Sequence, residues 1–320
     1  MKYHPHGSVL FCTFSLEEGL LFQSNPLCLV TLQSCLARAV SLCPVTISHF
    51  LAEANHVHMI FVVENPDDVP GFIRNFKVES AHMLNRVLGR TKRTVWCEGY
   101  DSPVVLTPMR ALSAIAYLYA NPAKDNLETS IDRYPGFSSW KMFCGGQTSA
   151  LWKRLHRPQF RELPKNAHNL KGYSDESARL LAEAREVQTF TLHPNAWMEA
   201  FGFRDAESQR RINERLIQRV RTLEQRAARK REKLGKTVVG RERLIARPID
   251  PLYRPKRKGM KTCCLSEKRR LRIQFITFFK KLMRQAREIR RQWRAGYTSL
   301  RYPPGLHPPS MPKLANVFVG

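Results

Sequence analysis

Residues 45–63 read VTISHFLAEANHVHMIFVV, two apolar runs that are separated by the short link Ala52–Asn55. Apolar runs of this length with period-two patterning predict β-strands, and two strands joined by so short a link predict a β-hairpin. The second strand of the hairpin is expected over His56–Val63. One side of the first strand is expected to carry Val45, Ile47, His49 and Leu51.

Strands and helices alternate on both sides of this hairpin. Before it, Ser8–Phe14 is an apolar run of strand length, and Pro26–Val40 has leucines at helical spacing behind an early proline. After it, two adjacent aspartates precede an apolar stripe, which predicts a helix over Asp67–Gly89. A fourth strand is expected over Thr94–Tyr100. The front of the chain is therefore predicted to follow the order β-α-β-β-α-β.

A further helix is predicted to begin at Pro108, because Thr107 is a suitable N-cap and proline suits the first helical position. This helix should stop near Asn121, since Pro122 disfavours helical geometry in the residue before it. The fold class expected is α+β: a ferredoxin-like βαββαβ domain, an added C-terminal helix that carries Tyr117, and then a basic, mostly helical extension.

Charge is distributed unevenly along the 320 residues of the chain. Lys and Arg number 53 against 27 Asp and Glu, a formal net charge of +26, yet residues 1–150 contain 12 of each sign. The whole excess lies in residues 151–320, and it favours a polyanionic partner, with nucleic acid ahead of an acidic membrane surface. No apolar run approaches the roughly 18 residues of a membrane-spanning helix, and no signal-peptide core is recognised at the start.

Three parts are expected: a front domain over 1–140, a connector packed on it over 141–204, and a basic helical extension over 205–320. The extension contains two amphipathic helices, Ser208–Leu234 and Ser266–Trp293, whose remaining faces are crowded with Lys and Arg. These faces predict binding to the DNA backbone. The alternative is a pair of solvated helices whose charge serves solubility.

A histidine pair, His56-Val57-His58, opens the second strand of the hairpin. Because side chains of a strand alternate, both imidazoles project from one face, a few ångströms apart. That arrangement suits two ligands to one metal ion, although histidines packed and hydrogen-bonded in a strand are common. The chain repeats the spacing at His4 and His6, where the intervening proline argues against a rigid strand.

One face of the helix that begins at Pro108 is polar. At 100° per residue this face carries Arg110, Ser113, Ala114, Tyr117 and Asn121. Tyr119 points to the opposite, apolar side and is expected in the core. Tyr117, aligned with an arginine and an amide, is better placed for chemistry, while a plain surface tyrosine is the alternative.

Four stretches taken together resemble a known family. They are Asn55-His56-Val57-His58, Trp96 in the last expected strand, Tyr117-Leu118-Tyr119-Ala120-Asn121-Pro122, and Tyr134-Pro135-Gly136-Phe137-Ser138-Ser139. Their order and spacing resemble those of the single-tyrosine, His-hydrophobe-His transposases, specifically the REP-associated tyrosine transposases, which are insertion-sequence-200-like. The resemblance covers about residues 8–140. One departure is Ala54, where the family usually has proline.

The resemblance implies a role for each of these residues. His56, His58 and Asn121 would bind a divalent ion, Mg²⁺ or Mn²⁺, and Tyr117 would attack DNA to give a 5′-phosphotyrosine and a free 3′-hydroxyl. A tyrosine hydroxyl with a pKa of about 10 is a weak nucleophile, and a metal-polarised phosphate compensates for this. Imidazole ligands alone would accept Zn²⁺ or Co²⁺ as well, so the choice of ion rests on the resemblance.

The substrate implied is single-stranded DNA with a hairpin, bound by a monomer or a homodimer. The protein is expected in the bacterial cytoplasm, associated with the nucleoid and not with a membrane. The expected DNA-binding residues are Lys77, Arg110, Arg254, Lys256 and Arg257. The alternative is a non-catalytic or domesticated nucleic-acid-binding protein with a ferredoxin-like domain and a basic arm. An RNA-recognition domain would carry stacking aromatics where this chain has His56 and His58.

Overall fold

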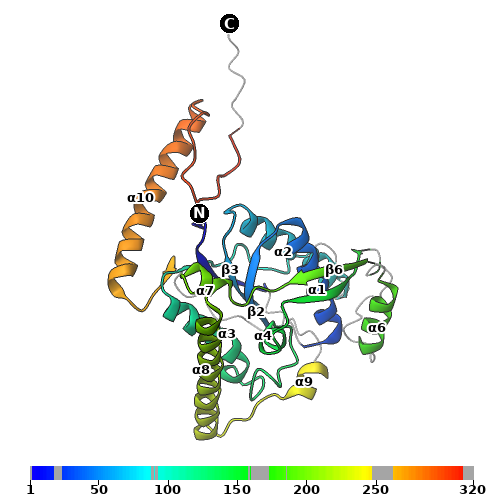
Figure 1. Ribbon diagram of the computed structural model, residues 1–320. Helices are drawn as coiled ribbons and strands as arrows, with labels where there is room; N and C mark the ends of the chain where they lie inside the picture. The colour runs from blue at the N-terminus through cyan, green and yellow to red at the C-terminus, as the bar shows by residue number, and fades with distance from the viewer. Residues whose placement is uncertain are drawn as a thin grey trace.

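The computed structural model describes residues 2–17, 24–87, 90, 93–157, 159, 173–184, 186–246 and 262–312. Its first elements are β1 (Val9–Ser15), α1 (Pro26–Leu42), β2 (Thr46–Glu53), β3 (His56–Val62), α2 (Asp68–Val87), β4 (Val104–Val105) and α3 (Pro108–Lys124). They are followed by α4 (Trp140–Cys144), β5 (Ser149–Arg154), α6 (Tyr173–Glu183), β6 (Glu186–Thr191), α7 (Ala196–Ala200), α8 (Ala206–Lys233), α9 (Arg241–Ala246), β7 (Cys264–Leu265) and α10 (Arg269–Arg294). The described residues form a mixed α/β structure (Figure 1).

The larger sheet has the strand order β2-β3-β1-β4-β7. Its first four strands pair antiparallel, whereas β7 pairs parallel to β4 and makes the sheet mixed. The predicted hairpin is present as β2 and β3, with Glu53 paired to His56 beside the turn. Ala54 in this turn has a φ of 44°, which the ring of a proline cannot adopt. The turn therefore excludes a proline at position 54.

Helices cover both faces of this sheet (Figure 1). α1 and α2 pack on the face that carries Cys12, Phe14 and Phe61. α3 packs on the opposite face, in a second apolar cluster that includes Ile60. Because side chains alternate along β3, His56 and His58 share the face of Ile60 and point toward α3.

The side-chain alternation predicted for the first hairpin strand is wrong in one respect. The pairing of β2 with β3 shifts between Ile47 and His49, which is a β-bulge. An extra residue at this point moves all later side chains to the other face. As a result Ile47 packs with α1 and α2, while Leu51 packs with α3.

The fourth strand predicted over Thr94–Tyr100 is not a regular strand. This segment runs beside β1 through isolated bridges, such as Leu16 to Trp96, and regular pairing is found at β4. Gly99 has a φ of 70°, outside the extended region, and so interrupts the ladder. The Trp96 indole donates a hydrogen bond to Ser80 of α2 at 2.9 Å, which holds the irregular segment on the core.

α3 also continues past the end predicted for it. Instead of stopping near Asn121 it includes Pro122 and ends at Lys124. Pro122 lacks only the hydrogen bond that its own N–H would have donated within the helix, and so close to the helix end this loss costs little. The N–H of Asp125 still reaches the carbonyl of Asn121 at 2.9 Å, and the N–H of Leu127 reaches that of Pro122 at 2.9 Å.

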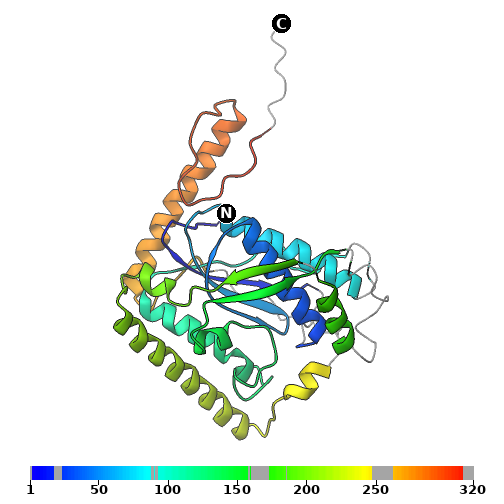
Figure 2. The ribbon, with the colours of Figure 1, turned by 45° about the vertical axis from the view of Figure 1, so that its right-hand side comes forward.

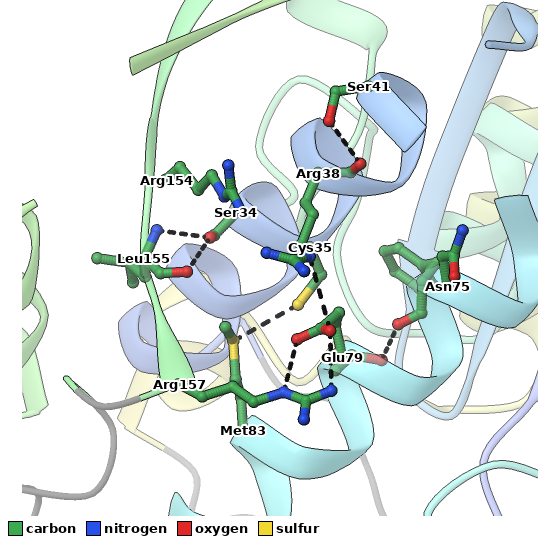
Figure 3. A network of polar contacts seen from close by, with 12 residues as sticks. Ser34, Cys35, Arg38, Ser41, Asn75, Glu79, Met83, Arg154, Leu155 and Arg157 are labelled. Carbon is green, nitrogen blue, oxygen red and sulfur yellow. Dashed lines mark hydrogen bonds and ion pairs between the residues drawn. The ribbon is translucent and has the colours of Figure 1, made fainter. Parts of the chain in front are cut away.

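The connector adds a two-stranded sheet, β5 with β6, beside α1. Figure 3 shows the polar contacts that hold the residues just after β5 against α1 and α2. Arg157 donates two hydrogen bonds to Glu79 of α2, at 2.8 and 3.0 Å. Ser34 of α1 accepts a hydrogen bond from the N–H of Leu155 at 2.8 Å.

The two basic helices are placed differently (Figures 1 and 2). α8 packs along α3, and its apolar residues Leu216 and Val220 are buried in the cluster on the α3 side of the sheet. α10 extends away from the sheet, and near its start Phe275 and Phe279 lie close to the ring of Tyr3. Among the described residues, no helix has the length and apolar character needed to cross a membrane.

Candidate metal and nucleophile site

The two histidines of β3 lie together under α3. Their ring centroids are 4.5 Å apart, and Phe11 of β1 stacks on His58 at 5.1 Å. His56 donates from Nδ1 to the side-chain oxygen of Asn55 at 3.0 Å, and Nδ1 of His58 is hydrogen-bonded to the hydroxyl of Thr13 at 2.8 Å. With the proton on Nδ1 in each ring, both Nε2 atoms carry a lone pair for a cation.

The protonation state of the pair suits a metal site. Burial lowers the pKa of His56, and it holds the pKa of His58 well below its usual value, with a contribution from the neighbouring His56 and Lys124. Both imidazoles are therefore neutral near pH 7, which is the form that binds metal ions.

A third titratable side chain, Glu53, is fully buried next to the pair. Its Oε2 is 4.0 Å from Nε2 of His56. Burial raises the pKa of Glu53 well above its usual value, helped by the Asp125 carboxylate and opposed by Lys124 and by a hydrogen bond with Asn121. A buried carboxyl beside two imidazoles and an amide fits a position next to a cation.

Tyr117 stands at the edge of this site on α3. Its side chain is 45% exposed, and its ring centroid is 6.4 Å from that of His58. The Nζ atom of Lys124 lies over the Tyr117 ring, 3.5 Å from the centroid, and donates to the side-chain oxygen of Asn121 at 3.2 Å. The last two turns of α3 thus bring a phenol, an amide and an ammonium together beside the histidine pair.

Tyr119, two residues further along α3, lies in the core as predicted. It is fully buried, and its hydroxyl is hydrogen-bonded to Nδ1 of His49 at 2.7 Å and to Ser139 at 2.8 Å. Burial raises the pKa of the Tyr119 hydroxyl above its usual range. Of the two tyrosines, Tyr117 alone is exposed to a reactant.

The donors present fit a divalent ion. His56 and His58 offer two neutral nitrogens, and Asn121, buried in the same region, offers an amide oxygen. Within the described ranges, no three His, Cys, Asp or Glu side chains form a ready metal cluster. A site of two imidazoles and oxygen donors is compatible with Mg²⁺ or Mn²⁺ and equally with Zn²⁺.

The residues predicted to bind DNA do not all gather here. Arg110 lies on the Tyr117 face of α3 and lines the same cavity as Tyr117. Lys77 belongs to α2, on the other side of the sheet, where its ammonium donates to the carbonyls of Cys97, at 2.9 Å, and Gly99. The remaining three lie outside the described residues: Arg254, Lys256 and Arg257.

Comparison with protein families gives a match over part of the chain. Residues 24–107 match the model of the family described as Transposase IS200 like. The predicted resemblance is confirmed over this segment. The matched segment contains both His56 and His58 and ends at Thr107, immediately before α3, so Tyr117 and Asn121 lie beyond it.

Other comparisons are more distant. A solved structure described as the REP-associated tyrosine transposase bound to a REP hairpin is 19% identical to this chain, with a TM-score of 0.38. It covers 45% of this chain and 84% of its own. A likeness at this TM-score is no evidence of a shared fold. No curated protein matches the chain significantly.

Three residues of the site escaped the sequence reasoning: Thr13, Glu53 and Lys124. Thr13 and Glu53 flank the histidine pair only through the pairing of β3 with β1 and β2. The hairpin register offered a signal for Glu53, because the two-residue turn places it directly opposite His56. Lys124 could be found only by extending α3 through Pro122.

Proposed function

We propose that this protein is a REP-associated tyrosine transposase that cleaves and rejoins single-stranded, hairpin-containing DNA through Tyr117 with the help of Mg²⁺ or Mn²⁺. The observation that carries the proposal is the approach of an exposed tyrosine to a neutral histidine pair in which His58 is buried and His56 partly buried, with the rings of Tyr117 and His58 6.4 Å apart. The order of strands and helices supports a ferredoxin-like domain over residues 1–140 with α3 as its added helix.

In the proposed reaction the hydroxyl oxygen of Tyr117 attacks a backbone phosphorus atom, and the phenolic proton leaves. The bond from phosphorus to the 3′ oxygen breaks, and that oxygen takes up a proton to become a 3′-hydroxyl. The DNA remains attached as a 5′-phosphotyrosine. Attack by a 3′-hydroxyl on this linkage reverses the step, so rejoining requires no ATP.

Four further side chains have a part in this scheme. His56 and His58 would hold a divalent ion through Nε2, and Asn121 would hold it through its amide oxygen. Such an ion would stabilise negative charge on the phosphate. The ammonium of Lys124, 3.5 Å from the Tyr117 ring centre, stabilises the negative charge that the phenol gains as it loses its proton.

Incubation with labelled single-stranded hairpin DNA and Mn²⁺ tests the proposal. We expect a covalent protein–DNA adduct on a denaturing gel. The adduct should not form when EDTA is present during the reaction, nor in Tyr117→Phe. Tyr119→Phe is the matched control, since it removes a tyrosine hydroxyl only two residues away along the chain, at a buried position. An adduct that survives in Tyr117→Phe would exclude Tyr117 as the nucleophile.

Metal binding is tested separately from cleavage. We expect Mn²⁺ binding, followed by electron paramagnetic resonance or calorimetry, to weaken at least 10-fold in His58→Ala. Metal binding and tight DNA binding without any adduct, across varied hairpins, would instead support the alternative of a non-catalytic nucleic-acid-binding protein.

A further inference from the structure

Two cavities lie beside α3, one lined by Tyr117 and the other by Lys124, and α8 forms a wall of both. The first has a volume of about 460 Å³ and is lined by Tyr117 and Arg110 of α3 and by Arg219 of α8. The second has a volume of about 480 Å³ and is lined by Lys124 of α3 and by Arg226 of α8. Each cavity is within the range that holds small ligands.

The two cavities adjoin at Leu223 of α8 and at the contact between Tyr117 and Lys124 of α3. Leu223 of α8 lines both cavities. Across from it, Tyr117 lines the first cavity and Lys124 the second, with the Lys124 ammonium over the Tyr117 ring. A strand that passed from one cavity to the other would run along the contact between Tyr117 and Lys124.

The linings suit nucleotides. The first cavity combines two arginines with apolar side chains, among them Phe11 and Leu265, against one acidic residue, Asp101. The second cavity is lined by one acidic residue, Asp125, and by several basic residues: Lys124, Arg226, Lys230, Arg231 and Lys236. Arginine and lysine contact phosphates, and apolar or aromatic surfaces accept bases.

We propose that the two cavities form one groove for the single-stranded DNA substrate, with the nucleotides on the two sides of the scissile phosphate in different cavities. In this arrangement α8, part of the basic extension, positions the substrate at Tyr117. This inference rests on the proposed function and adds the place where the strand lies.

The geometry of α8 separates groove positions from the rest of its surface. Arg219 and Arg226 line the cavities, whereas Arg229 is exposed and points about 60° away from Arg226 around the helix. All three are exposed arginines of one helix, so reversing any of them changes the net charge equally. Arg229→Glu is therefore a matched control for Arg219→Glu and Arg226→Glu.

Binding of the wild type and these variants to labelled hairpin DNA, measured by fluorescence anisotropy in Mn²⁺, tests the groove. We expect Arg219→Glu and Arg226→Glu each to weaken binding about 10-fold or more, and Arg229→Glu by no more than about 3-fold. Circular dichroism checks folding, and the Gln variants replace any Glu variant that is unfolded. Equal losses in all three variants would overturn the groove and leave only general charge attraction.

Neutral methylphosphonates placed next to the scissile phosphate test the path of the strand. We expect the defect of Arg219→Glu to shrink when the neutral linkage is on one side, and the defect of Arg226→Glu when it is on the other. If both variants respond to the same linkage, the strand does not pass from one cavity to the other. Failure of the wild type to form an adduct would count against the proposed function, whereas these binding results bear on the groove.

Discussion

His49 illustrates how a single buried side chain couples folding to pH. It lies in β2, fully buried, with Nδ1 hydrogen-bonded to Tyr119. Burial lowers the pKa of His49 from its usual value of 6.5 to about 3. The unfolded chain therefore binds a proton at this residue below pH 6.5 that the folded protein excludes.

This difference predicts a loss of stability in acid. Between pH 6.5 and pH 4, His49 should lower the free energy of unfolding by about 1.4 kcal/mol for each pH unit of acidification. The variant His49→Asn, which can still accept a hydrogen bond from Tyr119, should have a shallower pH dependence by about that slope. Urea unfolding at several pH values measures it, and equal slopes in the two proteins would contradict the assignment to His49.

At the scale of elements, the packing of α8 on α3 decides how the basic half relates to the front. Leu216 and Val220 of α8 lie in one apolar cluster with Ile115 and Leu118 of α3. Glu224 of α8 also accepts a hydrogen bond from the N–H of Ile131 at 2.7 Å. These contacts give α8 a structural role in addition to its charge, and they position the α8 residues that line the cavity of Tyr117.

This packing predicts that α8 unfolds together with the front sheet. Leu216→Ala, at a fully buried position, should lower the free energy of unfolding by about 2 to 5 kcal/mol. Leu234→Ala, just after the end of α8 and 56% exposed, should change it by less than about 0.5 kcal/mol. Urea unfolding followed by tryptophan fluorescence measures both, and a Leu216→Ala protein as stable as the wild type would show that α8 packs independently.

At the scale of the whole molecule, the excess positive charge and the candidate site lie in different parts of the chain. The histidine pair lies in the part of the chain whose acidic and basic residues balance, and the excess of +26 lies in residues 151–320. α8 brings part of that charge to the site, while α10 carries another part away from the sheet (Figure 2). We therefore expect a DNA strand at Tyr117 to contact two separate basic surfaces, one on α8 and one on α10.

Neutralising α10 should reveal its share of DNA binding. Four of its exposed cations are replaced together: Lys280→Gln, Lys281→Gln, Arg284→Gln and Arg287→Gln. If each contacts a phosphate of single-stranded DNA, the slope of log affinity against log salt should become shallower by about 3. Anisotropy titrations at several salt concentrations measure the slope, and thermal unfolding should be nearly unchanged. A slope identical to that of the wild type would mean that α10 does not touch the DNA.

Much of the secondary structure followed from local pattern. The hairpin, α1, α2, the start of α3 and both long basic helices lie where periodicity and capping residues predicted them. The failures occurred where the backbone departs from a regular period: the bulge after Ile47, the irregular segment before Asp101, and the last turn of α3. A sequence pattern indicates the average period of an element. It does not indicate where one extra residue forms a bulge or where a helix continues through a proline.

The sequence by itself determined that His56 and His58 share a face and that Tyr117 and Tyr119 point in different directions, because these relations depend only on the repeat of a strand and of a helix. The tertiary structure alone decided that Glu53 is fully buried and that α8, roughly a hundred residues further along the chain, lines the cavity of Tyr117. These relations arise from the burial of apolar surface between elements, which no local repeat specifies.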